Sequence, residues 1–164
     1  MSTKNHTHSR RPASSISRKR PPVSITASSA ARTRAAGRNL ARLLRPGDIV
    51  LLGGPVGSGK TTFAQGVAAG LGIRAHLRSS SFMLVNEYAA RGVRVYHMDL
   101  YRMEGVPLEE CGLDEYLTAG GICLVEWADH VRRVPARAFW RVAIRPRDEN
   151  TREITIEHHE NSCD

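Results

Sequence analysis

The chain has 164 residues with an ordinary hydrophobic content of 41%, enough for one domain with a buried core and not comfortably for two. No apolar run approaches the roughly 20 residues that a membrane-spanning helix needs. No apolar signal segment follows the first basic residues. We therefore expect neither a membrane protein nor a secreted one.

The net charge of +8 is unevenly distributed along the chain. Residues 1–47 contain eleven Lys/Arg and no acid, whereas the remainder contains thirteen Lys/Arg and sixteen Asp/Glu, a net charge of −3. The segment 1–22 is rich in Ser, Arg and Pro, which predicts a disordered basic leader. It could be a solvated tail, an arm that contacts nucleic-acid phosphates, or an organelle transit peptide. We expect the folded domain to span 23–158, with a short tail at 159–164.

Helical spacing predicts a helix over 30–44, with Arg34, Arg38 and Arg42 on the side opposite its apolar stripe. Such a basic row could bind RNA or a membrane surface, although most rows of this kind are simply solvated. The apolar run 48–52 is typical of a buried strand. Residues 60–71 have the spacing of a second helix.

The remaining segments alternate between strand and turn patterns. Apolar runs predict strands, and the short polar breaks between them predict turns. We expect short helical turns over 106–118 and strands over 79–90, 93–99, 121–127, 139–145 and 151–157. This order predicts an α/β fold: a single domain with a mixed, mostly parallel sheet flanked by helices and a C-terminal β-hairpin.

Residues 54–61 (GPVGSGKT) match the phosphate-binding P-loop pattern G-x-x-x-x-G-K-[ST], between an expected strand and an expected helix. Glycines allow backbone N–H groups to converge on phosphate oxygens, and the helix N-terminus adds partial positive charge. Lys60 is expected to reach the β- and γ-phosphates, and the Thr61 hydroxyl to bind Mg²⁺. The chain is therefore predicted to be a P-loop NTPase, and the lack of an N-K-x-D motif favours ATP over GTP.

Two acids follow buried strand segments, Asp99 after 95–98 and Glu126 after 122–125. In open α/β sheets, ligands bind at the carboxyl ends of the strands. Either acid alone could face solvent, but two of them together with a P-loop favour a site for metal and water. The serines at 79–81 are either a switch segment that contacts the γ-phosphate or an ordinary loop.

The cysteines Cys111, Cys123 and Cys163 match no metal or redox spacing, so we expect reduced thiols in a cytoplasmic protein. His158 and His159 look like a metal-binding pair only superficially. They lie in tail-like sequence without nearby partner ligands, and we expect them to be solvated.

Together these blocks resemble the TsaE family, small ATPases of bacterial tRNA threonylcarbamoyladenosine synthesis. The resemblance covers about 24–145 and depends on six segments: 33–41 (T-x-x-x-G-x-x-L-A), 54–63 (GPVGSGKTTF), 79–88 (SSSFMLVNEY), 97–102 (HMDLYR), 113–117 (LDEYL) and 124–128 (LVEWA). Two positions depart from the family pattern. Ser80 replaces a proline, which loosens the backbone, and Pro55 replaces an aspartate, which removes a carboxylate and an N–H from the loop.

The resemblance implies an ATP hydrolase that works with TsaD and TsaB homologues and meets tRNA only through that complex. TsaD carries the group transfer, and ATP hydrolysis supports turnover. The implied catalytic residues are Lys60, Asp99 and Glu126, and the implied magnesium site comprises Thr61, Glu126 and Asp99. Which of the two acids binds the metal directly stays open. The implied nucleotide-binding residues are Thr33, Gly57, Ser58, Gly59, Lys60, Thr61, Thr62 and Trp127.

Two other functions compete with this reading. A small-molecule kinase on a P-loop scaffold needs an acceptor pocket and an arginine-bearing lid, for which Arg132, Arg133 and Arg137 could supply charge, although no lid insertion is evident. An RNA-binding module that uses ATP as a switch would instead rely on residues 1–45.

Overall fold

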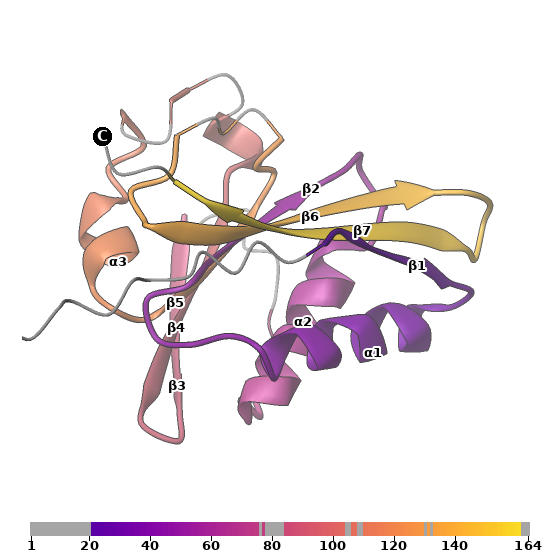
Figure 1. The fold of residues 1–164 in the computed structure, drawn as a ribbon, viewed down its shortest axis with the longest axis horizontal. Coiled ribbons are helices and arrows are strands. Elements are labelled where there is room, and N and C mark those ends of the chain that lie inside the picture. Colours follow the sequence, from indigo (N-terminus) through magenta and orange to yellow (C-terminus); the bar gives the residue numbers. More distant parts are fainter. Residues whose placement is uncertain are drawn as a thin grey trace, which may run out of the picture.

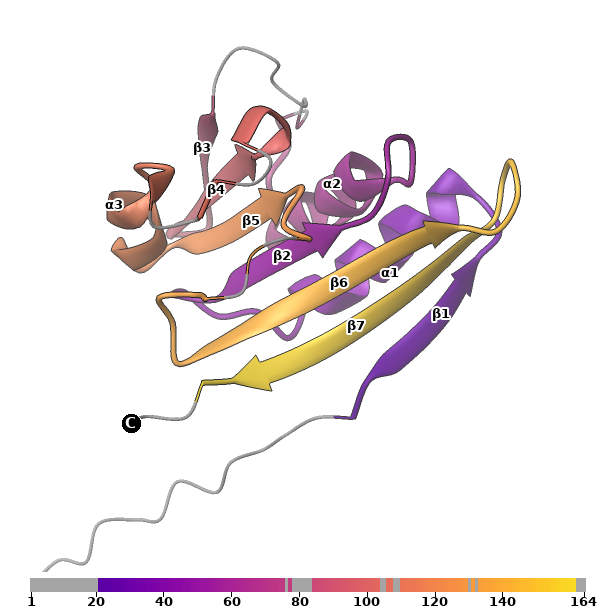
Figure 2. The ribbon, with the colours of Figure 1, turned by 90° about the horizontal axis from the view of Figure 1, so that it is seen from above.

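The computed structural model describes residues 21–75, 77, 84–103, 106–107, 110–129, 131 and 133–161. Within these residues, seven strands form one sheet in the order β1-β7-β6-β2-β5-β4-β3 (Figures 1 and 2). The strands are β1 (Val23–Ala27), β2 (Ile49–Gly53), β3 (Val85–Ala90), β4 (Val93–Asp99), β5 (Ile122–Glu126), β6 (Ala138–Pro146) and β7 (Arg152–Glu160). The helical segments are α1 (Ala30–Ala41), α2 (Lys60–Leu71), η1 (Tyr101–Met103) and α3 (Asp114–Thr118).

The centre of the sheet is parallel and its margins are antiparallel. β2 lies between β5 and β6 and is parallel to both, and β4 is parallel to β5. β3, β7 and β1 pair in the antiparallel sense. The expected α/β fold, with its mixed sheet and C-terminal hairpin of β6 and β7, is confirmed.

The alternation of side chains along β2 separates two hydrophobic layers. Val50 and Leu52 face α1 and α2, whereas Ile49 and Leu51 face the layer that includes Leu117 of α3. Figure 2 shows α1 and α2 side by side behind the sheet. Because β2 is buried on both faces, the loop that follows it leaves the sheet from its most rigid part.

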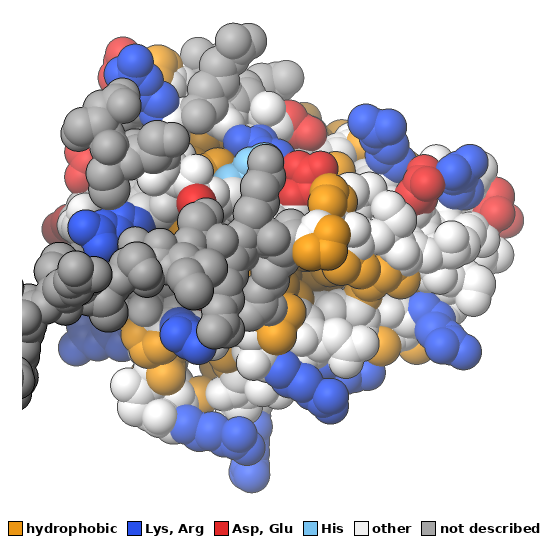
Figure 3. Space-filling model, in the orientation of Figure 1, with side chains coloured by type: hydrophobic (Ala, Val, Ile, Leu, Met, Phe, Trp, Pro, Cys, Tyr) orange, Lys and Arg blue, Asp and Glu red, His pale blue; other side chains and the backbone are white. Residues whose placement is uncertain are grey.

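Glycines bring α1 and α2 into unusually close contact. A Cβ added at Gly66 would lie 2.2 Å from the carbonyl oxygen of Arg34, and one at Gly37 would lie 2.3 Å from that of Phe63. The arginine row of α1 is exposed at Arg34 and Arg38. Figure 3 shows Lys and Arg side chains scattered along this side of the molecule, the pattern of a solvated helix face.

The Gly66→Ala variant is expected to lose about 1–3 kcal/mol of unfolding free energy, because the added methyl group cannot fit against the Arg34 carbonyl. In an open helix the same change stabilises by up to about 1 kcal/mol. Chemical denaturation followed by circular dichroism measures the difference. As a control, Ala69→Gly on the exposed side of α2 is expected to cost no more than about 1 kcal/mol. A higher unfolding free energy for Gly66→Ala than for the wild type would contradict the close approach of α1 and α2.

The C-terminal strand differs from expectation. β7 continues through Glu160, so His158 and His159 lie in the sheet and not in a solvated tail. The His159 ring stacks on Phe139 with 5.0 Å between centroids, and the His158 ring lies 4.6 Å from that of Trp140. The placement of these histidines in a tail was therefore wrong, because their aromatic partners come from β6, although the His159 side chain remains 40% exposed.

Other differences are smaller. β1 was not expected, because its five residues pair only with β7 at one margin of the sheet. α1 ends at Ala41, three residues before the predicted end, and in 106–118 the described helix is α3. The first part of the strand predicted at 79–90 lies outside the described residues, as do the serines at 79–81. No described helix has the length and apolar character needed to cross a membrane.

Candidate nucleotide-binding site

The phosphate loop connects the carboxyl end of β2 to the first turn of α2. Gly54 has φ of 133° and Gly59 has φ of 104°, values that favour glycine. A Cβ at Gly54 would also lie 2.2 Å from the carbonyl oxygen of Ile144. No side chain caps the N-terminus of α2. Its first N–H groups therefore remain without a side-chain acceptor, as an anion site requires.

Lys60 lies over this loop in a buried position, with only 4% of its surface exposed. Its Nζ donates hydrogen bonds to the carbonyl oxygens of Gly54 (2.7 Å) and Pro55 (2.9 Å). The same ammonium lies 3.7 Å from the centroid of the Trp127 ring. Burial lowers the pKa of Lys60, and the negative charges of Glu126, Asp129 and Asp99 oppose that shift. The cation is thus held at the loop by neutral acceptors and surrounded by acids.

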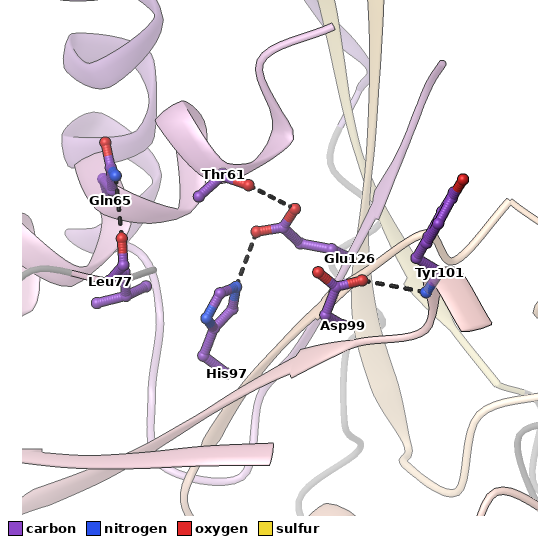
Figure 4. A network of polar contacts seen from close by, with 7 residues as sticks. All are labelled: Thr61, Gln65, Leu77, His97, Asp99, Tyr101 and Glu126. Carbon is purple, nitrogen blue, oxygen red and sulfur yellow. Dashed lines mark hydrogen bonds and ion pairs between the residues drawn. The ribbon is translucent and has the colours of Figure 1, made fainter. Parts of the chain in front are cut away.

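Glu126 is the centre of a buried polar network beside the loop (Figure 4). Its Oε2 accepts a hydrogen bond from Thr61 Oγ1 at 2.8 Å, and its Oε1 lies 2.8 Å from His97 Nε2. Both Glu126 and His97 are only 1% exposed. His97 Nδ1 is buried and has no hydrogen-bond partner within the described part of the chain. Contacts on both oxygens therefore fix the orientation of the Glu126 carboxylate.

Asp99 lies directly opposite Glu126 in the parallel pairing of β4 with β5. Its Oδ1 accepts a hydrogen bond from the backbone N–H of Tyr101 at 3.0 Å, and Figure 4 shows its carboxylate beside that of Glu126. The structure therefore brings the two predicted strand-end acids together, and both act electrostatically on Lys60.

The oxygen ligands gathered here fit Mg²⁺, which prefers carboxylate, hydroxyl and phosphate oxygens. Thr61 and Glu126 are already in contact, and Asp99 is the neighbour of Glu126 in the sheet. Among the described residues, no group of three or more His, Cys, Asp and Glu side chains is arranged to hold a metal by itself. A magnesium ion at this site would therefore depend on phosphate oxygens, as it does in P-loop sites generally.

A second part of the site lies on the other side of the phosphate loop. A pocket of about 150 Å³ is lined by α1, the loop and the β6–β7 turn: Ala30, Thr33, Gly57, Gly59, Thr62, Glu149, Asn150 and Arg152. Thr33 is buried, and its hydroxyl donates to the carbonyl oxygen of Ser29 at 3.3 Å. Four of the predicted nucleotide-binding residues thus share one pocket.

Ser58 contributes backbone hydrogen bonds to the loop, and Trp127 has an unusual backbone conformation beside it. Ser58 donates its backbone N–H to Pro55, and its carbonyl oxygen accepts from Arg152, so these backbone groups shape the loop. Trp127 has a positive φ of 62°, which is uncommon for a large side chain. The centroid of its ring lies 4.8 Å from that of Tyr101 and 3.7 Å from Lys60 Nζ, so the indole contacts both residues.

Sequence reasoning missed three residues at this site. Asp129 accepts a hydrogen bond from the Gly54 N–H, which lies 3.0 and 3.1 Å from its two carboxylate oxygens. The second residue is His97, which contacts the Glu126 carboxylate. It lies two residues before Asp99 and therefore on the same face of β4, so the strand spacing could have indicated it. Arg152 reaches the loop from β7, and no local pattern indicates that contact.

The site is a glycine-rich loop between a central parallel strand and a helix, and its lysine and threonine lie next to two strand-end carboxylates. This arrangement defines a P-loop nucleotide-binding domain of the α/β class. Arg137, one of the arginines considered for a kinase lid, lies at the amino end of β6, whereas the phosphate loop lies at the carboxyl ends of the parallel strands. Arg132 lies outside the described residues.

Comparison with known proteins identifies the family. The model of the family described as "Threonylcarbamoyl adenosine biosynthesis protein TsaE" matches residues 27–154, and the chain belongs to this family. It is 41% identical over 124 residues to the tRNA threonylcarbamoyladenosine biosynthesis protein TsaE of Bacillus subtilis (strain 168), covering 76% of this chain and 78% of the relative. The protein of the same name from Treponema pallidum (strain Nichols) is 34% identical over 121 residues, covering 73% and 89%.

A solved structure agrees with these relatives. The crystal structure of Bacillus subtilis YdiB superposes with a TM-score of 0.67 at 32% sequence identity, and the match covers 86% of this chain and 87% of that one.

Proposed function

We propose that this protein is an Mg²⁺-dependent ATP hydrolase of tRNA threonylcarbamoyladenosine biosynthesis, activated by homologues of TsaD and TsaB. Family membership supports the pathway, since the relatives carry that name. The observation that carries the enzymatic part is the contact between Thr61 of the phosphate loop and the buried Glu126 carboxylate. In this proposal the protein is cytoplasmic and meets tRNA only within the assembled complex.

The phosphate loop would bind the triphosphate through the N–H groups at the start of α2 and through Lys60. Lys60 would exchange its present acceptors, the carbonyl oxygens of Gly54 and Pro55, for phosphate oxygens. Because those acceptors already hold the ammonium at the loop, binding requires little further loss of side-chain conformational entropy. Thr33 and Thr62 would line the nucleoside side.

Glu126 and Thr61 would hold the magnesium ion, and His97 would keep the Glu126 carboxylate in the required orientation. When bound, the ion would neutralise charge on the phosphate oxygens. Asp99, which is less buried than Glu126, would accept a hydrogen bond from the attacking water. Two observations support this division of labour: side chains contact both oxygens of Glu126, and Asp99 is less buried than Glu126.

The purified chain is expected to hydrolyse ATP slowly alone, and about tenfold or more faster when its authentic TsaD and TsaB homologues are added, a coupling typical of partner-regulated sites. Steady-state phosphate release with each partner omitted in turn measures the effect. The control adds a small-molecule acceptor mixture without the partners. An absent rise with both partners would contradict the proposal, and ATP consumption that requires a small acceptor would favour the kinase alternative.

A further inference from the structure

Arg152, the first residue of β7, connects the C-terminal hairpin to the phosphate loop. Its Nε donates to the carbonyl oxygen of Ser58 at 3.0 Å, and its Nη2 lies 3.4 Å from that of Gly57. These partners are 94 and 95 residues away in the sequence. The contact is therefore a product of the fold, made where β7 begins beside the loop.

The same guanidinium is anchored in the β6–β7 turn. Its Nη1 lies within hydrogen-bonding distance of the carbonyl oxygens of Asp148 (3.1 Å), Glu149 (3.2 Å) and Thr151 (3.1 Å). The turn is itself ordered by the Asp148 carboxylate, which accepts from the N–H groups of Asn150 and Thr151. Those backbone hydrogen bonds lower the pKa of Asp148, so the carboxylate stays charged at neutral pH. One planar cation thus joins two loops.

Fixing a carbonyl oxygen also fixes the N–H of the following residue, because a trans peptide group directs the two to opposite sides. The Ser58 carbonyl points to Arg152, so the Gly59 N–H points away from it. Likewise, the Gly57 carbonyl points to Arg152, and the Ser58 N–H is directed at the Pro55 carbonyl inside the loop. The guanidinium therefore determines how the peptide groups of the phosphate loop are aligned.

We propose that Arg152 is a positioning residue, which aligns the backbone of the phosphate loop for the triphosphate without touching it. This inference rests on the proposed function, namely that the loop binds ATP. Arginine suits the task and lysine does not, because only a guanidinium offers several donors in a fixed plane that can span two loops. The alternative is that Arg152, which also lines the 150 Å³ pocket, contacts the nucleoside directly.

The experiment measures equilibrium binding of two ligands, ATP and inorganic tripolyphosphate, by competition in the presence of Mg²⁺. The full chain is compared with Arg152→Gln, Arg152→Lys and the matched control Arg147→Gln. The exposed Arg147 lies on the same hairpin, and its guanidinium donates to Glu153 of β7 at 2.9 Å. Thermal unfolding without ligand confirms that each variant is folded, and Arg152→Lys, which retains the positive charge but not the planar set of donors, serves if Arg152→Gln does not fold.

We expect Arg152→Gln to weaken ATP and tripolyphosphate by the same factor, about tenfold or more, as for lost hydrogen bonds from a charged group. Arg152→Lys should recover little of this loss, and Arg147→Gln should stay within about twofold of the wild type. Unchanged binding, a loss confined to ATP, or full recovery with Arg152→Lys would each overturn the positioning role. Wild-type protein that binds neither ligand would instead overturn the proposed function.

Discussion

Replacing Lys60 by Met is expected to weaken ATP binding by at least about 100-fold, equivalent to about 2.7 kcal/mol. The buried ammonium is held against the loop by the Gly54 carbonyl oxygen, and without it backbone N–H groups would leave the phosphate charge poorly compensated. Isothermal titration with ATP and Mg²⁺ measures the loss. Arg74→Met, which removes an exposed positive charge just after α2, is the matched control and should bind normally. Undiminished affinity in Lys60→Met would rule out the assigned role.

The same substitution is expected to raise the thermal stability of the ligand-free protein at pH 7. Burial lowers the pKa of Lys60, so its charged form is less favourable in the folded protein than in the unfolded chain. The charge therefore costs stability in full below the lowered pKa, and the cost declines as the pH rises from that value to the ordinary lysine pKa of the unfolded chain, above which it is gone. A neutral side chain of similar length removes this cost. Each kcal/mol of stability gained raises the unfolding midpoint by about 2–4 °C. An unfolding midpoint of Lys60→Met below that of the wild type would contradict this expectation.

Glu126→Gln is expected to reduce partner-stimulated ATP hydrolysis by at least about 100-fold, the range found when a charge-stabilising group is removed. The amide keeps the shape of the side chain and hydrogen-bonding groups for Thr61 and His97, but it is a far weaker magnesium ligand. The fold should therefore survive while the dependence on Mg²⁺ weakens.

Single-turnover hydrolysis across a magnesium series tests this expectation, with circular dichroism to confirm folding. Glu115→Gln, an exposed change on α3 that removes the same charge, is the control. A Glu126→Gln protein with normal rate and normal magnesium dependence would show that the carboxylate next to Thr61 has no part in the reaction.

The parts of this site that sequence reasoning found are those whose geometry is local or follows from a general rule. The P-loop spacing carries its own geometry, since the strand, the glycines and the helix are contiguous. Asp99 and Glu126 were expected at one place because parallel strands end at the same margin of a sheet, and their register confirms that they are neighbours.

The parts that escaped prediction depend on distant pairing. Arg152 meets Ser58 across 94 residues, and its contact requires the hairpin to be placed beside the loop. Asp129 was overlooked because it lies 75 residues from Gly54 in the sequence, and only the fold brings its carboxylate to the Gly54 N–H. β1 escaped for the same reason, because only its antiparallel pairing with β7 makes it a strand.

The glycine contacts between α1 and α2 have a mechanical consequence. With backbone against backbone at Gly37 and Gly66, no side chain can change rotamer to let one helix slide along the other. Thr33 and Gly59, whose Cβ position lies 3.7 Å from the Thr33 methyl group, are carried by these two helices. The wall of the nucleoside pocket and the phosphate loop must then move together as one rigid unit.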